Sequence, residues 1–255
     1  MNSVFEYINY LWNAKGRHGT HSPFVYEFVD NCLRETVNND FIKERNLLFE
    51  SLKKNHNSIT IQDFGVGSKR LSNERIIADI FNTSSSKGKF GKLLYQLSAY
   101  YKPKRILEFG TSLGIGSIHL SKGNSSAHIV TVEACEETHL EALKNFKQLN
   151  CENIESIKST FDEFLLSYSG EPFDLVFIDG HHDGEALKRY LHQLDLLTHN
   201  DTIFILDDIR WSNSMLEAWK SIVASPKFHV TMDLFRMGIV LKREQQEKEH
   251  FTVKI

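Results

Sequence analysis

The spacing of apolar residues changes near residue 104 and divides the chain into two parts. Before that point, apolar residues recur at helical spacing behind Ser3 and again behind Ser22 and Pro23, two residues suited to a helix start. After it, short apolar runs alternate with helical patterns. We therefore expect a mainly helical N-terminal segment, residues 1–90, that covers the substrate, and an α/β domain over residues 91–255.

The second part alternates between strand-like and helix-like stretches, which favours a parallel sheet with helices on both faces. Only a few residues separate the last two expected strands, so that pair should be antiparallel. The expected fold is α/β: a Rossmann-like seven-stranded sheet, mostly parallel with an antiparallel last strand. The expected strands are 105–109, 128–133, 154–158, 173–179, 202–207, 228–233 and 236–242. The expected helices between the first six are 115–122, 136–149, 161–168, 184–197 and 213–224.

A glycine-rich turn follows the first of these strands, in the stretch RILEFGTSLGIGS at residues 105–117. Glycine lets a backbone turn sharply and approach a ligand closely, so this turn is a candidate cofactor site. The stretch ITIQDFGVGSKR at 59–70 is a competing candidate with two glycines, Gly65 and Gly67. The later turn is favoured, because the earlier one is followed by a charged stretch that does not begin as a packed helix.

Acidic residues end several of the expected strands, at the edge of the sheet where ligands of such folds bind. Glu133 ends the second strand and is placed to accept hydrogen bonds from a ribose, although it could instead favour the following helix through the helix dipole. Asp179 ends the fourth strand, and Asp207 and Asp208 end the fifth. Three clustered carboxylates repel one another unless a proton or cation intervenes, and an all-oxygen set suits Mg²⁺. As caps of the following helices, these acids would need no metal.

His182 follows Asp179 by three residues and is a candidate general base beside such a metal. A second group of cations and imidazoles, Arg17, His18 and His21, lies between the two N-terminal helices. That loop is either a ligand-binding loop or a solvated turn whose histidines cap helix ends.

Composition and charge narrow the function classes. The formal net charge of −3 gives no global reason to expect nucleic acid or an anionic membrane as partner. No apolar run approaches the roughly 20 residues of a spanning helix, and the first residues lack the features of a signal peptide. The three cysteines are an odd set without paired spacing, which indicates reduced thiols. We expect a soluble cytoplasmic protein; its charged C-terminal end is either a solvated tail or a subunit contact, so a homodimer stays open.

At this point the residues resemble the class I S-adenosylmethionine-dependent methyltransferases, and among them the metal-dependent O-methyltransferases of the catechol and caffeoyl-CoA type. LEFGTSLGIGS, VTVEAC, VFIDGHH and LDDIRWS match four of the family's motifs in order, over roughly residues 90–242. The resemblance implies S-adenosylmethionine and a divalent ion, most simply Mg²⁺, as cofactors. It places Glu108, Gly110, Thr111 and Gly114 around the methionine part, Glu133 at the ribose, and Ser159 to Asp162, with Phe161 among them, near the adenine. The metal ligands would be Asp179, Asp207 and Asp208, with Asp179 also beside the cofactor and His182 as the catalytic partner of Asp179.

Two departures from the catechol pattern bear on the substrate. Catechol-type enzymes usually have Asp-Asn where this chain has Asp207-Asp208, and a lysine near His181-His182. The DGxH form is closer to metal-dependent sugar O-methyltransferases, in which the equivalent histidine is implicated as base. The expected activity is therefore O-methylation of a small-molecule hydroxyl, phenolic or sugar-like. The stretch RHGTHSPF, residues 17–24, looks like a feature of a bacterial methyltransferase subgroup.

Three alternatives stay open. An NAD-dependent oxidoreductase would use the same glycine turn and Glu133, but it leaves the three acids unexplained. A tRNA or other nucleic-acid methyltransferase shares the fold, although no NPPY-like motif follows the fourth strand. A cofactor-binding module without catalysis is the third.

Overall fold

The computed structural model describes residues 3–14, 22–62, 74–84 and 86–255. The glycine pair Gly65 and Gly67 and the loop residues Arg17, His18 and His21 lie outside the described residues. Within these ranges no helix combines the length and the apolar character needed to cross a membrane.

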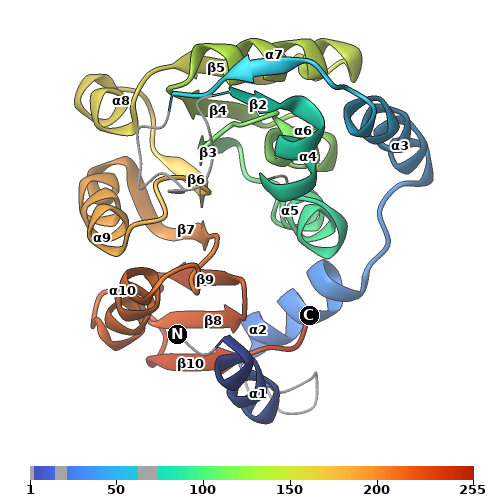
Figure 1. Ribbon diagram of the computed structural model, residues 1–255. Coiled ribbons are helices and arrows are strands. Elements are labelled where there is room, and N and C mark those ends of the chain that lie inside the picture. Colours follow the sequence, from blue (N-terminus) through green and yellow to red (C-terminus); the bar gives the residue numbers. More distant parts are fainter. Residues whose placement is uncertain (1–2, 15–21, 63–73, 85) are drawn as a thin grey trace.

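An eight-stranded sheet forms the centre of the molecule (Figure 1). Its order is β10-β8-β9-β7-β6-β3-β4-β5. All paired neighbours are parallel except those of β9, which runs antiparallel to both β7 and β8. The strands are β3 (Arg105–Phe109), β4 (His128–Glu133), β5 (Ile154–Lys158), β6 (Phe173–Ile178), β7 (Thr198–Leu206), β8 (Val230–Leu234), β9 (Met237–Leu241) and β10 (Glu249–Thr252). A separate antiparallel pair joins β1 (Ser58–Thr60) to β2 (Glu74–Ile76).

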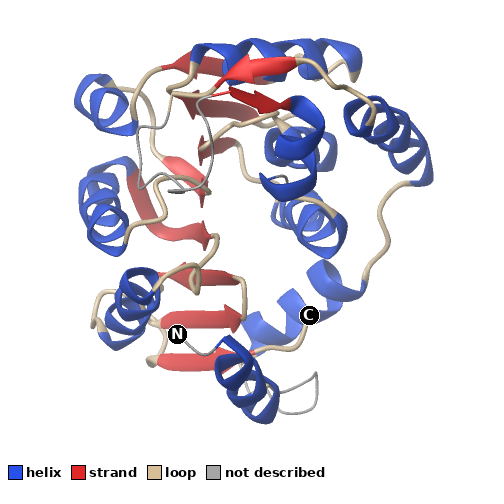
Figure 2. Ribbon diagram, in the orientation of Figure 1, coloured by secondary structure: helices blue, strands red, loops and turns tan. Residues whose placement is uncertain are grey.

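Helices cover both faces of the sheet (Figure 2). One face carries α8 (Phe161–Ser167), α9 (Gly184–Gln193), continued by a 3₁₀ turn, Leu194–Leu197, and α10 (Asn213–Ala224). The other carries α5 (Gly88–Tyr101), α6 (Ile115–Gly123) and, packed against α6, α7 (Glu136–Gln148). The N-terminal part adds α1 (Ser3–Asn13), α2 (Pro23–Phe28) with a π-helical segment, Val29–Arg34, α3 (Asn39–Lys53) and α4 (Ile77–Ser84).

The central strand β3 shows why two helical layers are needed. Successive side chains of a strand point to opposite faces of the sheet. Ile106 packs among the residues of α2 and α5, whereas Leu107 and Phe109 pack among those of α8, α9 and α10. All three are fully buried, so β3 reads as a continuous apolar run, as a strand buried on both faces should.

The α/β fold expected from the sequence is confirmed. The seven expected strands and five expected helices are all present, with ends that move by a few residues at most apart from β7, which begins at Thr198. The last two of the seven strands are antiparallel, as their short connection required. Ser22 and Pro23 do begin α2, but the Ser22 side chain makes no capping hydrogen bond.

The C-terminal end is not the solvated tail that was one of the two expectations for it, because it adds the eighth strand. Residues 249–252 pair with β8 in parallel, and Val253 is fully buried. The hydroxyl of Tyr10 in α1 donates a hydrogen bond to the Val253 carbonyl at 2.6 Å. The two ends of the chain are therefore packed together, and the expected boundary at residue 90 falls inside α5.

Candidate active site at the carboxyl edge of the sheet

The glycine turn connects β3 to α6 and lies against the residue that follows β6. Gly110 has φ of +98°, and a Cβ built there would lie 2.1 Å from the carbonyl oxygen of Asp179. The Asp179 amide donates to the Phe109 carbonyl at 2.8 Å, which extends the pairing of the two strands by one residue. Only glycine permits this approach, so the turn brings Asp179 directly beside the first motif.

A small pocket opens at this contact. Its lining includes four residues that the sequence placed at the cofactor or the metal, and it adds one from the N-terminal part: Glu108, Gly110, Thr111, Asp179 and Ser86. The Ser86 hydroxyl lies 3.4 Å from Oδ2 of Asp179. Gly114 does not line this pocket; it precedes α6 with φ of +76°, where a Cβ would meet the ring of Phe146.

Glu108 is buried under the glycine turn and is held by hydroxyl groups. Thr131 donates to its Oε2 at 2.6 Å, and Ser117 donates to the same oxygen. Thr131 also bonds to Thr111 at 2.6 Å, so the network reaches the turn itself. Burial raises the pKa of Glu108 to about 7, although the hydrogen bonds from Ser117 and Thr131 oppose that shift.

The raised pKa of Glu108 gives a pH-dependent expectation. Because the pKa is raised in the folded state, stability from this group is present below about pH 4.5 and is lost as the pH rises through about 7. Glu108→Gln, which cannot ionise, should therefore unfold at a higher denaturant concentration than the wild type at pH 8 and at a similar one at pH 5. One pKa unit corresponds to about 1.4 kcal/mol, so the difference at pH 8 is on the order of 3 kcal/mol. Parallel pH dependences of the two proteins in urea titrations would contradict this expectation.

Glu133 and Phe161 border the same turn from β4 and α8. The carboxylate of Glu133 accepts hydrogen bonds from the backbone amides of Ser112 and Cys135, both at 2.9 Å. Phe161 stacks on Phe109 with ring centroids 4.6 Å apart. One face of the Phe161 ring is thus occupied by the core.

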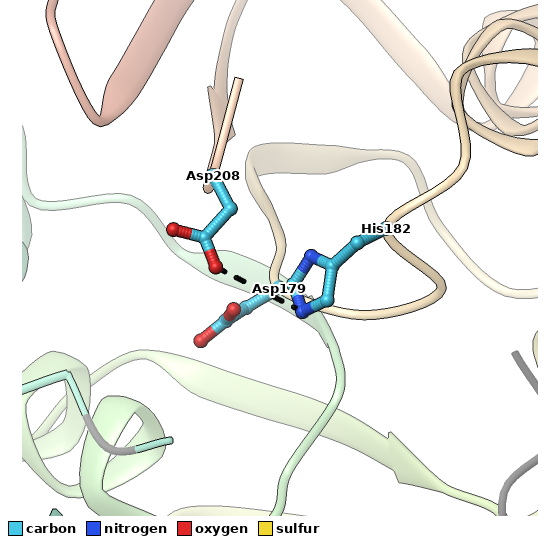
Figure 3. Close-up of side chains that lie close together, drawn as sticks. All are labelled: Asp179, His182 and Asp208. Atoms are coloured by element: carbon cyan, nitrogen blue, oxygen red, sulfur yellow. Dashed lines mark ion pairs between the residues drawn. The ribbon is translucent and has the colours of Figure 1, made fainter. Parts of the chain in front are cut away.

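Three side chains converge from the ends of β6 and β7. One oxygen of Asp179, one oxygen of Asp208 and one ring nitrogen of His182 lie within 4.8 Å of one another (Figure 3). The distance between His182 Nε2 and Asp208 Oδ2 is 3.9 Å. The neighbouring imidazole, His181, turns away, because its Nδ1 pairs with the Tyr190 hydroxyl at 2.7 Å. Of the two adjacent histidines, only His182 faces the acids.

Asp207 is not in this group. Its carboxylate, which has no exposed surface, forms two hydrogen bonds with the guanidinium of Arg236, at 2.9 and 2.6 Å. Among the three acids expected from the sequence, the structure brings together Asp179 and Asp208, and it pairs Asp207 with Arg236, a residue outside the expected site. Arg236 directly precedes β9, and because that strand is antiparallel to β7, its start lies at the carboxyl end of β7.

The electrostatics of the cluster fit a site built to receive positive charge. Burial raises the pKa of Asp179 well above its usual range, and the charges of Asp207 and Asp208 raise it further. The pKa of Asp208 is raised by burial and by Asp207, while Arg236 and His182 oppose that shift. A cation or a proton at this edge would relieve the repulsion between Asp179 and Asp208.

Comparison with known proteins places the glycine turn and the acidic strand ends in one domain. The methyltransferase domain family matches residues 107–209. An O-methyltransferase of Aspergillus hancockii is 31% identical over 129 residues, 48% of this chain and 50% of its own length. The catechol O-methyltransferase of Mycobacterium tuberculosis is 29% identical over 122 residues, 47% of this chain and 54% of its own length. The chain thus spans about half the length of these curated relatives.

Solved structures show the same fold. The O-methyltransferase from Bacillus cereus in complex with SAH superimposes with a TM-score of 0.55 at 24% identity, over 63% of this chain and 84% of its own. An SAH-bound methyltransferase of Podospora anserina gives a TM-score of 0.54 at 19% identity, over 82% of this chain and 97% of its own. Residues 107–209 therefore match the methyltransferase domain family, and the chain resembles the class I S-adenosylmethionine-dependent O-methyltransferases of the catechol and caffeoyl-CoA type.

Proposed function

We propose that this chain transfers a methyl group from S-adenosylmethionine to a hydroxyl of a small molecule, phenolic or sugar-like, with the help of a divalent ion. The observation that carries the proposal is the convergence of Asp179, Asp208 and His182 beside the pocket at the glycine turn. A protein that only binds the cofactor would need the pocket but not these three side chains. The two acids and the imidazole supply what a reaction at a hydroxyl requires, namely a place for a cation and a proton acceptor.

The cofactor would lie over the glycine turn. Gly110 and Thr111 line the pocket, and Glu133, whose carboxylate already fixes the turn through Ser112, has remaining acceptor capacity for ribose hydroxyls. Phe161 approaches Gly180, the residue after Asp179, and would border the adenine with its free edge. The turn that would hold the cofactor lies directly against Asp179, at the edge of the sheet where ligands of such folds bind.

Asp179 and Asp208 would hold the divalent ion. Two atoms bound to one ion at about 2.1 Å are at most about 4.2 Å apart, so the two carboxylates need only a small movement to share one. When bound, such an ion lowers the pKa of the acceptor hydroxyl and orients its oxygen. The two acids come from neighbouring parallel strands, which gives the site a rigid base.

His182 would receive the proton of the acceptor hydroxyl. Its ring lies on the rim of the site, 5.5 Å from the ring of Trp211, and its Nε2 faces Asp208. Proton transfer would leave an imidazolium that faces the carboxylate of Asp208. His182→Gln should therefore lower kcat strongly while it leaves binding of the ion within a few-fold.

The proposal is tested by calorimetry and by methyl transfer. SAH should bind the purified chain, and NADH should not. Radiolabelled S-adenosylmethionine should label an acceptor in a panel that contains a catechol and glycosides with free vicinal hydroxyls, and EDTA should stop the labelling until Mn²⁺ or Mg²⁺ is restored. Binding of NADH in place of SAH would overturn the cofactor, and labelling that survives EDTA would overturn the role of the ion.

A nucleic-acid substrate is the second candidate, because one similar protein is named as an RNA methyltransferase. A ribosomal RNA small subunit methyltransferase D of Buchnera aphidicola is 26% identical over 127 residues, 48% of this chain and 65% of its own length. The same labelling assay with RNA as acceptor separates the two candidates. Labelled RNA with no labelled small molecule would favour this second function.

A further inference from the structure

Arg236 places a fixed positive charge among the acids of the candidate site. Its guanidinium donates a hydrogen bond to each carboxylate oxygen of Asp207, and its Nε also lies 3.1 Å from Oδ1 of Asp208. Two of the three carboxylates at this edge therefore share one guanidinium. A planar guanidinium that binds a carboxylate through two parallel hydrogen bonds is among the strongest side-chain pairs.

Asp207 has little left to offer an ion. In addition to the two bonds from Arg236, its Oδ1 accepts the backbone amide of Asp208 at 2.8 Å. The side chain has no exposed surface. An ion could bind Asp207 only by breaking this pair, which would take the charge partner from a carboxylate that has no exposed surface.

The backbone around Arg236 keeps the guanidinium in this position. The Ile209 amide donates to the Arg236 carbonyl at 3.0 Å, which joins the loop that carries Asp208 to the turn before β9. The guanidinium also lies 5.1 Å from the centre of the Phe90 ring of α5. Arg236 is thus held by β7, β9 and α5, and it is not a surface arginine that happens to reach the site.

We propose that Arg236 is an internal cation that determines how many carboxylates the divalent ion can use and how tightly it binds. The guanidinium withdraws Asp207 from the ion and offsets one negative charge, so that Asp179 and Asp208 remain as the ligands. This inference rests on the proposed function, because it assumes that an ion binds at this edge. Arg236 acts through the acids, and it is therefore a positioning residue.

The experiment is calorimetric titration of Mn²⁺ into the full chain and two variants. Arg236→Gln removes the positive charge and releases Asp207, so Mn²⁺ should bind at least about tenfold more tightly than to the wild type, a gain of about 1.4 kcal/mol. The double variant Asp207→Asn/Arg236→Gln keeps the net charge of the wild type and replaces the ion pair with two amides. It should bind Mn²⁺ within a few-fold of the wild type, because Asp207 is not a ligand.

The two variants have distinct contradicting results. Unchanged or weaker Mn²⁺ binding by folded Arg236→Gln overturns the inference, and so does a loss of tenfold or more in the double variant, which would make Asp207 a ligand. The double variant decides the matter if Arg236→Gln does not fold. Binding of SAH, measured on the same samples, shows that the domain is intact. If the wild type binds SAH but no Mn²⁺, the role of the ion in the proposed function is wrong. If the wild type binds Mn²⁺ and either variant gives one of the contradicting results above, only the role of Arg236 is wrong.

Discussion

Replacing Asp179 with asparagine should lower methyl transfer by about 1,000-fold or more, equivalent to about 4 kcal/mol of transition-state stabilisation. Asp179 lines the pocket at the glycine turn, and one of its oxygens lies within 4.8 Å of an oxygen of Asp208 and a ring nitrogen of His182. An amide keeps the shape of the side chain but loses the negative charge that an ion requires. The loss should appear in kcat with S-adenosylmethionine, Mn²⁺ and the acceptor at saturation, and in Mn²⁺ affinity.

The same substitution should stabilise the ion-free protein at neutral pH. Burial and the charges of Asp207 and Asp208 raise the pKa of Asp179, so stability from this group is present at low pH and is lost as the pH rises through that raised pKa. An amide does not ionise and avoids this loss. Lower activity together with a higher melting temperature at pH 7 to 8 is the signature of a charge kept for function. Full activity in Asp179→Asn would remove Asp179 from the mechanism.

Asp174 provides a matched control at the opposite end of the same strand. It accepts the amides of Lys104 and Arg105 and pairs with His199 at 2.9 Å. Burial opposes its charge, but these partners hold the pKa of Asp174 below its usual range. Asp174→Asn should therefore lower the melting temperature at neutral pH, where Asp179→Asn raises it, and should leave methyl transfer unchanged.

The sequence predicts the sheet well because each buried strand leaves a clear pattern. The sequences of β3, β4, β6 and β7 are mainly apolar on both faces, and each is followed by or ends in an acid or a glycine turn. Because these strands are parallel, their carboxyl ends lie at the same edge of the sheet. Strand β10 has no such pattern. It is an edge strand with two exposed residues, and its pairing depends on β8 and on the contact between Tyr10 and Val253, which lie far apart in sequence.

The candidate site, like the sheet, could be predicted from the sequence only in part. That Asp179 and Asp208 would meet follows from the parallel order of β6 and β7. That Arg236 would take Asp207 could not be read from charge or spacing alone, because the pairing depends on how the turn before β9 folds over the end of β7. The signal that could have pointed to such a contact is a cation between two apolar strands, directly before an antiparallel one. Ser86 had no comparable signal, since it lies within the polar stretch NTSSSK, residues 82–87, in the connection between α4 and α5.

Gly110→Ala should abolish measurable SAH binding and destabilise the fold. The added Cβ would lie 2.1 Å from the Asp179 carbonyl oxygen, a backbone atom held by the bond between the Asp179 amide and the Phe109 carbonyl. Neither backbone segment can move away without separating the ends of β3 and β6. The residue would also carry φ of +98°, which costs an L-residue about 1–2 kcal/mol. Calorimetry with SAH and urea unfolding measure the two effects.

Gly88→Ala separates the clash from the conformational cost. Gly88 has φ of +58°, and a Cβ there meets nothing within 4 Å, so alanine should cost only about 1 kcal/mol of stability and keep SAH affinity within a few-fold. The difference between the two variants measures the close contact of Gly110 with Asp179, the contact that joins the glycine turn to the acids. Equal SAH affinities for Gly110→Ala and Gly88→Ala would mean that the cofactor does not depend on this turn, and the proposed cofactor site would have to be sought elsewhere on the sheet.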